Sequence, residues 1–320
     1  MNNFALTYTV KNEATLLPDA IAYHLSIGCQ LIIVFFDGTT DRTRELVSGL
    51  PQVLCFDSVS SEALQVDQEW IRDIDKRWHL SMDVRKRINT MYAASIAKKR
   101  GIEWIANIDP DELLVLENEG GSASGAQNFF NIKENIDQIL VPNVESVSCS
   151  DTVEKPFEEC IYFLNRFYKT EAVWRASLFM VRKFIHSPRA HAWFDFLFYR
   201  IRFLMRFPRL MKHPVTKINI PTGFFLGYSN HKAFIRTKTF SEFKFNIHRW
   251  EKIVRHPVSV RRGLLLHYDL PNPTYLKEKF SQRPPAMLVK EFYVRHELAK
   301  IAREMDFPKI KDFFRENIAI

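Results

Sequence analysis

The chain has 320 residues, of which 46% are hydrophobic and 26% charged, and its formal net charge is +8. This length and composition suit one large or two modest hydrophobic cores, and they exclude a disordered or fibrous protein. No apolar run reaches the roughly 18 residues that a membrane span needs. The four cysteines lack metal-binding spacing and are expected to be reduced, and the first ten residues are predicted to form a strand and not a signal peptide.

Strand-like and helix-like segments alternate along the first half of the chain. In chain order they are Phe4–Val10, Leu16–Ile27, Leu31–Phe36, Asp41–Ser48 and Val53–Val59. The alternation predicts a mainly parallel sheet covered by helices. A helix over Arg85–Arg100 that Gly101 stops, a strand that ends at Asp109 and a further strand over Asp137–Val141 continue the pattern. The first half is therefore predicted to have an α/β fold.

The charge is distributed unevenly between the two halves. Residues 1–160 carry 14 Lys and Arg against 25 Asp and Glu, whereas residues 161–320 carry 31 against 12. An acidic half suits a cation, and a basic half suits phosphates, an anionic glycan or an anionic membrane face. Neither zinc-finger spacing nor an RNP-type aromatic motif accompanies the basic half, so nucleic acid is not an expected partner.

The basic half contains an aromatic-rich segment from Ala192 to Lys212. Arg202, Arg206 and Arg209 recur there at helical spacing, which would set a basic stripe along an aromatic surface. A helix that lies in an anionic lipid interface fits this pattern, and a core helix with solvated arginines is the alternative. Further helices are predicted over Tyr275–Lys279 and Glu291–Met305.

Two carboxylates, Asp109 and Asp111, lie two positions apart where an apolar strand ends. In an extended chain such side chains point the same way, and Pro110 favours an extended conformation at Asp109. Ligands of open α/β sheets collect at the carboxyl ends of the strands, where Asp37 and Asp57 are also expected. Hard oxygen ligands there suit Mg²⁺ or Mn²⁺ carrying a substrate diphosphate. A solvated turn that caps the next helix is the alternative.

Several blocks of sequence follow one another in the order known from a family of enzymes. They are Thr9–Glu13 (a KNE strand end), Ala22–Gly28 (an AYH helix), Asp37–Asp41 (a DNGSTD-like turn) and Trp104–Leu114 (a DxDEFL-like block). Together they resemble the nucleotide-diphospho-sugar transferase (GT-A) fold, specifically bacterial enzymes related to glycosyltransferase family 2. Beyond residue 150 the likeness is limited to Asn230–Arg236 with Asn246–His248, and to Leu266–Tyr268 with the lysines that follow. One departure is Phe36, where the family usually has an acidic residue, which weakens the assignment of uridine as the base.

The resemblance implies a fold and a reaction. The fold would be a Rossmann-like, mainly parallel sheet flanked by helices, with a basic, aromatic-rich helical C-terminal region. Residues 1–160 would bind the nucleotide-sugar and the metal, and residues 161–320 would bind the acceptor, associate with the membrane and complete the catalytic domain. The enzyme would transfer a sugar with inversion from a nucleotide-diphosphate sugar, a UDP-sugar by weak preference, to a bacterial surface glycan or a lipid-linked acceptor. It would act in the cytoplasm, peripheral to the inner face of the cell membrane.

The resemblance also implies the residues of the site. Mn²⁺ or Mg²⁺ would be held by Asp109, Asp111 and His267, with His248 as the alternative histidine. The donor would be contacted by Lys11, Asn12, Glu13, Asp37, Arg85, Asn89, Asp109, Lys277 and Lys279. For Arg85 and Asn89 a solvated helix face is the alternative. An inverting transfer needs a carboxylate base, and no motif selects among Asp151, Glu154, Glu158 and Glu159.

Two other functions stay open on the sequence alone. The same carboxylates could hold a nucleoside triphosphate for nucleotidyl or phosphoryl transfer. Alternatively, the basic aromatic half could make the chain a membrane or polyanion adaptor without enzymatic activity.

Overall fold

The computed structural model describes residues 3–64, 68–117, 125–163, 210–212, 219–221, 231–281 and 293–319. The chain divides into two compact units: Met1–Asn143 with Ser229–His267, and Val144–Tyr228 with Tyr268–Ile320. The halves predicted from charge met at residue 160. The first unit instead takes in part of the basic half, because strands from residues 231–267 pair with strands from the acidic half.

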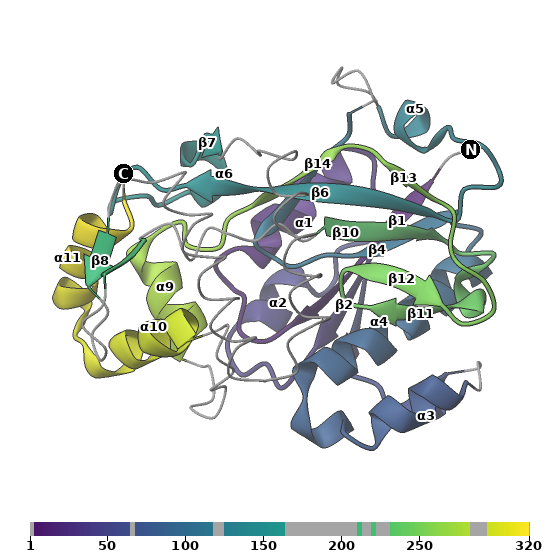
Figure 1. Cartoon of the computed structure of the whole chain (residues 1–320), viewed down its shortest axis with the longest axis horizontal. Helices are drawn as coiled ribbons and strands as arrows, with labels where there is room; N and C mark the ends of the chain where they lie inside the picture. The colour runs from purple at the N-terminus through teal and green to yellow at the C-terminus, as the bar shows by residue number, and fades with distance from the viewer. Residues whose placement is uncertain are drawn as a thin grey trace, which may run out of the picture. The chain divides into compact units, whose positions relative to one another are not determined.

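A mixed sheet forms the centre of the first unit (Figure 1). Its strands are β1 (Phe4–Val10), β2 (Leu31–Phe36), β3 (Val53–Asp57), β4 (Trp104–Asn107), β5 (Glu112–Val115), β6 (Gln138–Val147), β10 (His231–Arg236), β13 (Ser259–Arg261) and β14 (Leu264–His267). The main path runs β3-β2-β1-β4-β10-β6-β14-β5, and β13 pairs with β6. The strands β1 to β4 are parallel, as predicted. The strand β10 is antiparallel to β4 and β6, and β14 is antiparallel to β5, so the sheet is mixed and not mainly parallel throughout.

Helices cover both faces of the parallel strands. They are α1 (Leu17–Ser26), α2 (Thr43–Val47), α3 (Glu69–Asp75), α4 (Met82–Lys99) and α5 (Ala126–Phe130). The hairpin of β11 (Phe243–Asn246) and β12 (Arg249–Lys252) packs beside α4. The helix α4 stops just before Gly101, whose φ of +70° favours glycine, so the predicted stop is confirmed.

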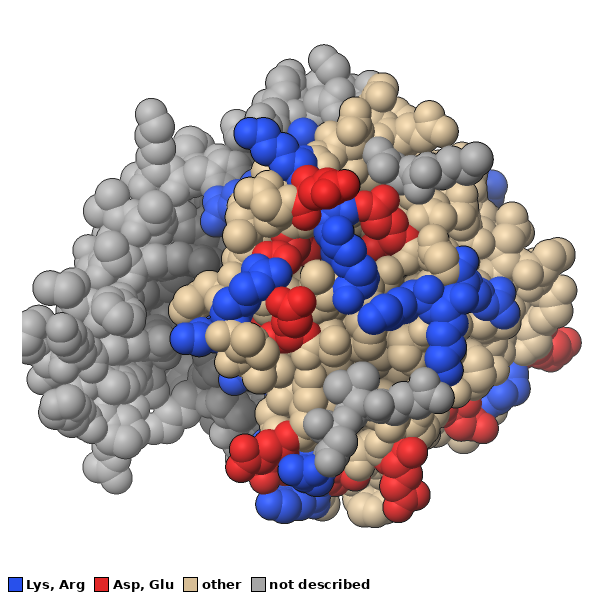
Figure 2. All heavy atoms as spheres, turned by 90° about the vertical axis from the view of Figure 1, so that its right-hand side faces the viewer, with Lys and Arg blue, Asp and Glu red and all other residues tan. Residues whose placement is uncertain are grey.

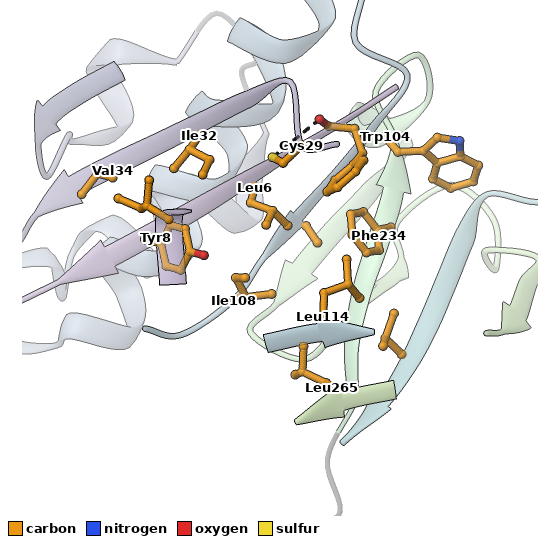
Figure 3. Close-up of a cluster of buried hydrophobic side chains, with 14 of the residues drawn as sticks. Leu6, Tyr8, Cys29, Ile32, Val34, Trp104, Ile108, Leu114, Phe234 and Leu265 are labelled. Atoms are coloured by element: carbon orange, nitrogen blue, oxygen red, sulfur yellow. Dashed lines mark hydrogen bonds between the residues drawn. The ribbon is translucent and has the colours of Figure 1, made fainter. Parts of the chain in front are cut away.

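The core has two layers because alternate residues of each strand face opposite sides. Leu6 and Tyr8 of β1 lie with Ile32 of β2 in the cluster that α1 and α5 cover, and Figure 3 shows these side chains around the centre of the sheet. Ala5 of β1 faces the other cluster, together with Met91 of α4. Burial on both faces explains why these strands are almost continuously apolar.

Two side chains of α1 hold β5, which ends the main path of the sheet. The Tyr23 hydroxyl donates to the Leu114 carbonyl at 3.0 Å, and the Leu114 N–H donates to Nε2 of His24 at 3.1 Å. The proton of His24 is therefore on Nδ1, which lies 2.6 Å from the Ala20 carbonyl and 2.9 Å from the Tyr8 hydroxyl. Side-chain bonds thus satisfy an edge strand that would otherwise expose backbone groups.

Gly263, directly before β14, lies so close to Val115 and Phe129 that a side chain has no room there. Its φ is +68°, and a Cβ there would lie 2.6 Å from the Val115 carbonyl oxygen and 2.9 Å from the Phe129 ring. We expect Gly263→Ala to lower the free energy of unfolding by roughly 2 kcal/mol in urea titrations, since both strain and a backbone clash oppose it. Gly101→Ala is the control, because its Cβ would meet nothing within 4 Å. Equal losses in the two variants would contradict the clash.

The second unit contains a helical cluster near the C-terminus. Its described elements are α6 (Pro156–Glu159), β7 (Tyr162–Phe163), β8 (Leu210–Lys212), β9 (Asn219–Pro221), α9 (Pro273–Ser281), α10 (Tyr293–Glu304) and α11 (Phe307–Asn317). Leu276, Leu298 and Phe314 join α9, α10 and α11 in one apolar core. The two helices predicted near the C-terminus are confirmed as α9 and α10.

The predicted interfacial helix from Ala192 to Lys212 falls mostly outside the described residues. Its last three residues form strand β8, which pairs with β9, so the helical prediction is wrong for them. Among the helices that the structure describes, none has the length and apolar character to cross a bilayer. On the described part of the face in Figure 2, Lys and Arg side chains lie side by side with Asp and Glu.

Candidate functional site

The Asp109-Pro110-Asp111-Glu112 sequence forms the turn between β4 and β5. The Glu112 N–H donates to the Asp109 carbonyl at 3.1 Å, and the Asp109 N–H donates to the Glu112 carboxylate at 2.7 Å. The two ends of the turn therefore hold each other. The turn leads into a strand, and Asp111 and Glu112 are buried, so the alternative of a solvated turn that caps a helix is wrong.

Asp109 lies between two lysines. One carboxylate oxygen pairs with Lys86 of α4, and the other lies 2.6 Å from Nζ of Lys232 on β10. Lys232 also lies 3.1 Å from the Glu112 carboxylate. Burial alone would raise the pKa of Asp109, but Lys232 and Lys86 hold that pKa well below its ordinary value. The pKa of Glu112 is raised, mainly by burial.

Asp111 has a different partner, His267. Nε2 of His267 lies 3.6 Å from a carboxylate oxygen of Asp111, and both side chains are at least nine-tenths buried. The pairing of β14 with β5 sets His267 opposite Glu112 and so brings it to the turn. The structure thus brings together two of the residues predicted to bind a metal, from distant parts of the sequence.

His248, the alternative metal ligand, lies in the tight turn between β11 and β12. Ile247 before it has a φ of +43°, which is rare for a β-branched residue. Burial, followed by the charges of Lys232 and Lys86, lowers the pKa of His248 to about 3. Its main electrostatic neighbours are therefore the lysines around Asp109, and its imidazole is neutral at physiological pH.

Two of the predicted donor-binding residues after β1 are bonded to the loop after β2. Asn12 has a φ of +55°, and its side-chain oxygen accepts from the backbone N–H groups of Thr40 at 2.7 Å and Asp41 at 3.2 Å. The Glu13 N–H donates to the Thr43 hydroxyl at 2.8 Å, and Lys11 is exposed. The two loops thus form one bonded surface at the carboxyl ends of neighbouring strands.

Arg85 and Asn89 brace this surface from α4. Arg85 forms a two-pronged ion pair with Asp37, with one contact at 2.8 Å. Asn89 is fully buried, accepts from the Val59 N–H at 2.9 Å and donates to the Thr9 hydroxyl at 3.1 Å. A solvated helix face is therefore wrong for Asn89, whose bonds go to protein groups that join the ends of β1 and β3.

The remaining predicted site residues belong to the second unit. Asp151 lies 2.7 Å from Arg315, and Glu158 lies 3.2 Å from Lys155. Glu159 accepts from the backbone N–H groups of Glu154 and Lys155 at the start of α6. These contacts stabilise the local structure, and they do not distinguish a catalytic base among the four candidates.

The two predicted lysines of the second unit lie on α9. Lys279 pairs with Asp269 at 2.8 Å. Lys277 precedes it by two residues, about 200° around the helix axis at 3.6 residues per turn. The two side chains therefore start from opposite sides of α9. This arrangement does not favour the binding of one diphosphate by both lysines.

Sequence reasoning missed Lys86 and Lys232. Lys86 is aligned with Thr90, Ala93 and Ala97, the small buried residues of α4 that face the sheet. A lysine on such a buried face indicates a charged partner, because an ammonium group is rarely buried unless it is paired. Lys232 lies in the segment Asn230–Arg236 that resembles the family, but its partners lie more than a hundred residues earlier, so the sequence did not indicate its contacts.

The fold and site define a mixed α/β protein with a carboxylate–histidine pair at the carboxyl edge of its parallel strands. Residues 6–305 match the sequence model of glycosyltransferase family 92, so the chain belongs to this family. A relationship to family 2, which the motifs suggested, stays a prediction.

Two curated relatives come from Arabidopsis thaliana. Glycosyltransferase-like At2g41451 is 24% identical over 157 residues, which cover 46% of this chain and 34% of that protein. Glycosyltransferase-like At3g57200 is 24% identical over 162 residues, which cover 46% of this chain and 30% of that protein. The chain thus spans about a third of the length of the relatives that it matches.

Solved structures give weaker likenesses. HddC from Yersinia pseudotuberculosis is 9% identical with a TM-score of 0.33, covering 93% of this chain and 99% of that one. A mycobacterial protein is 10% identical with a TM-score of 0.32, covering 88% of this chain and 72% of that one. These scores are too low to establish a shared fold.

Proposed function

We propose that the chain is a GT-A type glycosyltransferase that moves a sugar from a nucleotide-diphosphate sugar to a glycan or lipid-linked acceptor, with inversion and with a divalent cation. Membership of family 92 supports the class of enzyme. The observation that carries the proposal is the Asp111–His267 pair, which β14 completes beside the turn after β4.

The pair fits a divalent cation in kind and in spacing. A carboxylate oxygen and an imidazole nitrogen are ligands that Mn²⁺ accepts. Neighbouring ligands of an octahedral ion at about 2.1 Å lie roughly 3 Å apart, and the observed separation is 3.6 Å. When bound, such a cation would neutralise the charge that develops on the leaving diphosphate.

The bonded surface around Asn12 is the proposed site of the nucleoside. Lys11 is exposed there, and Asn12 and Glu13 are half-buried, so all three residues lie at the surface that a base and ribose would meet. Asp37 is buried and paired with Arg85, and we propose that this ion pair holds the shape of this surface. The catalytic base stays unassigned among Asp151, Glu154, Glu158 and Glu159.

The acceptor and the location of the enzyme are proposals drawn from charge. The excess of Lys and Arg in residues 161–320 supports an anionic glycan or a lipid-linked acceptor and a place at the inner face of the cell membrane.

The proposal is tested by thermal unfolding with a panel of nucleoside diphosphates. At about 100 times its dissociation constant, the correct nucleotide should stabilise the fold by about 3 kcal/mol and raise the melting temperature by several degrees. The shift should require Mn²⁺ or Mg²⁺ and vanish in EDTA. Failure of every nucleotide to shift the transition would reject the proposal. Release of pyrophosphate from a nucleoside triphosphate and a sugar phosphate would instead indicate nucleotidyl transfer.

A further inference from the structure

Two buried lysines meet at Asp109 and have no part in the proposal above. The side chains of Lys86 and Lys232 are 9% and 4% exposed, whereas that of Asp109 is 32% exposed. The carboxylate therefore lies between the ammonium groups and the solvent. An anion that approaches the lysines meets the position of Asp109 first.

The charges explain why Asp109 is held there. A buried ammonium group costs several kcal/mol unless it is paired, and Lys86 and Lys232 come from a helix and a strand that are far apart in the sequence. Each oxygen of Asp109 pairs with one of them, and Glu112 adds a second contact to Lys232 at 3.1 Å. Asp109 is thus the shared counter-ion of both lysines.

The same contacts make Asp109 a poor ligand for a cation. Both of its oxygens already face an ammonium group, and a divalent ion brought to it would be repelled by two positive charges at close range. Asp111 differs, because its carboxylate lies beside the imidazole of His267. The two aspartates, although two residues apart, therefore face different groups: Asp109 faces two ammonium groups, and Asp111 faces an imidazole.

We infer that Lys86 and Lys232 form an anion site for the diphosphate of the donor, and that Asp109 is its resting counter-ion and not a ligand of the cation. Phosphate oxygens accept charge-assisted hydrogen bonds from lysine as a carboxylate does, so they can take the places of the two Asp109 oxygens. This inference rests on the proposed function, since the donor supplies the diphosphate.

The test uses inorganic pyrophosphate as the probe and calorimetry in EDTA as the measurement. Asp109→Asn removes the internal competitor and should tighten pyrophosphate binding by about tenfold or more relative to the unmodified chain. Lys86→Gln and Lys232→Gln should each weaken it by about fivefold or more. Asp73→Asn is the matched control, because it removes the same charge from an exposed pair with Lys76, and it should leave the affinity unchanged.

Manganese binding, measured without nucleotide by electron paramagnetic resonance, separates the two roles of the aspartates. The affinity for Mn²⁺ should fall much less in Asp109→Asn, which changes only the nearby charge, than in Asp111→Asn, where it should be lost. Weaker pyrophosphate binding in Asp109→Asn, or a loss of Mn²⁺ affinity equal to that of Asp111→Asn, would overturn the inference. If Asp109→Asn does not fold, Lys86→Gln decides the question, since Asp109 keeps Lys232 there. Unchanged pyrophosphate binding in that variant rejects the site.

The outcomes also separate this inference from the proposed function. Tighter pyrophosphate binding in Asp109→Asn without turnover of any nucleotide-sugar by the unmodified chain would uphold the anion site and reject sugar transfer. Metal-dependent sugar transfer together with unchanged pyrophosphate affinity in Asp109→Asn would uphold sugar transfer and reject the anion site.

Discussion

Replacing Asp111 with Asn is expected to lower metal-dependent sugar transfer by roughly 100-fold or more, because an interaction that neutralises the leaving diphosphate provides several kcal/mol. Asn has the same shape and lacks the charge, so the effect isolates electrostatics from packing. The affinity for Mn²⁺ should fall in parallel. The measurements are donor turnover at saturating nucleotide-sugar and Mn²⁺ titration of the free enzyme.

Stability distinguishes this result from simple damage to the fold. Asp111 is buried beside Asp109 and Glu112, and its negative charge opposes the ionisation of both. Removing a like charge from this group should leave the melting temperature unchanged or raise it. Asp73→Asn, which removes an exposed carboxylate paired with Lys76, is the control and should keep full activity. An Asp111→Asn enzyme with intact turnover would exclude the proposed metal site.

Acidification from pH 6.5 to pH 4 is expected to remove about 3 kcal/mol of stability through His24 alone. The unfolded chain takes up a proton at this residue below about pH 6.5, whereas burial lowers the pKa of His24 in the folded state to about 4. Between these values the unfolded state binds more protons, so the contribution is complete above pH 6.5 and is lost as the pH falls. Urea titrations across this range measure it.

His24→Gln tests the assignment. The variant should be less stable at pH 7, because the Leu114 N–H and the Tyr8 hydroxyl lose their partner, and its stability should depend less on pH. His248, with a pKa lowered to about 3, acts with the same sign, so the double variant should show the flattest profile. His79→Gln, at an exposed site, should keep the full slope. An unchanged slope in His24→Gln would contradict this account.

Local patterns predicted the parallel strands β1 to β4 and the helices α1, α2 and α4. The strands β1 and β2 have the predicted bounds, because each is an apolar run that ends at a polar turn and is buried on both faces. The helix α4 begins at Met82, three residues before the predicted Arg85, and its first turn packs Val84 into a small apolar cluster with Ile74 of α3. In contrast, the antiparallel strands β10 and β14 join the sheet through partners far away in the sequence, which no local pattern records.

The site was predicted in part for the same reason. The turn at Asp109 and the importance of His267 followed from motifs, and the structure brings His267 to Asp111. The partners of Asp109 could not be predicted, because Lys86 and Lys232 meet there only after the sheet and α4 have packed. The AYH motif was noted for its resemblance, whereas the hydrogen bonds of His24 to β5 became visible only in three dimensions.

The pairing of β14 with β5 has a consequence for how the protein matures. The two members of the carboxylate–histidine pair are separated by about 150 residues of sequence. A ribosome has produced the strands β1 to β4 and the turn after them long before His267 emerges. Under the proposed function, the cation site would form only when the late strand β14 pairs with β5, so acquisition of the ion would report that this strand has joined the sheet.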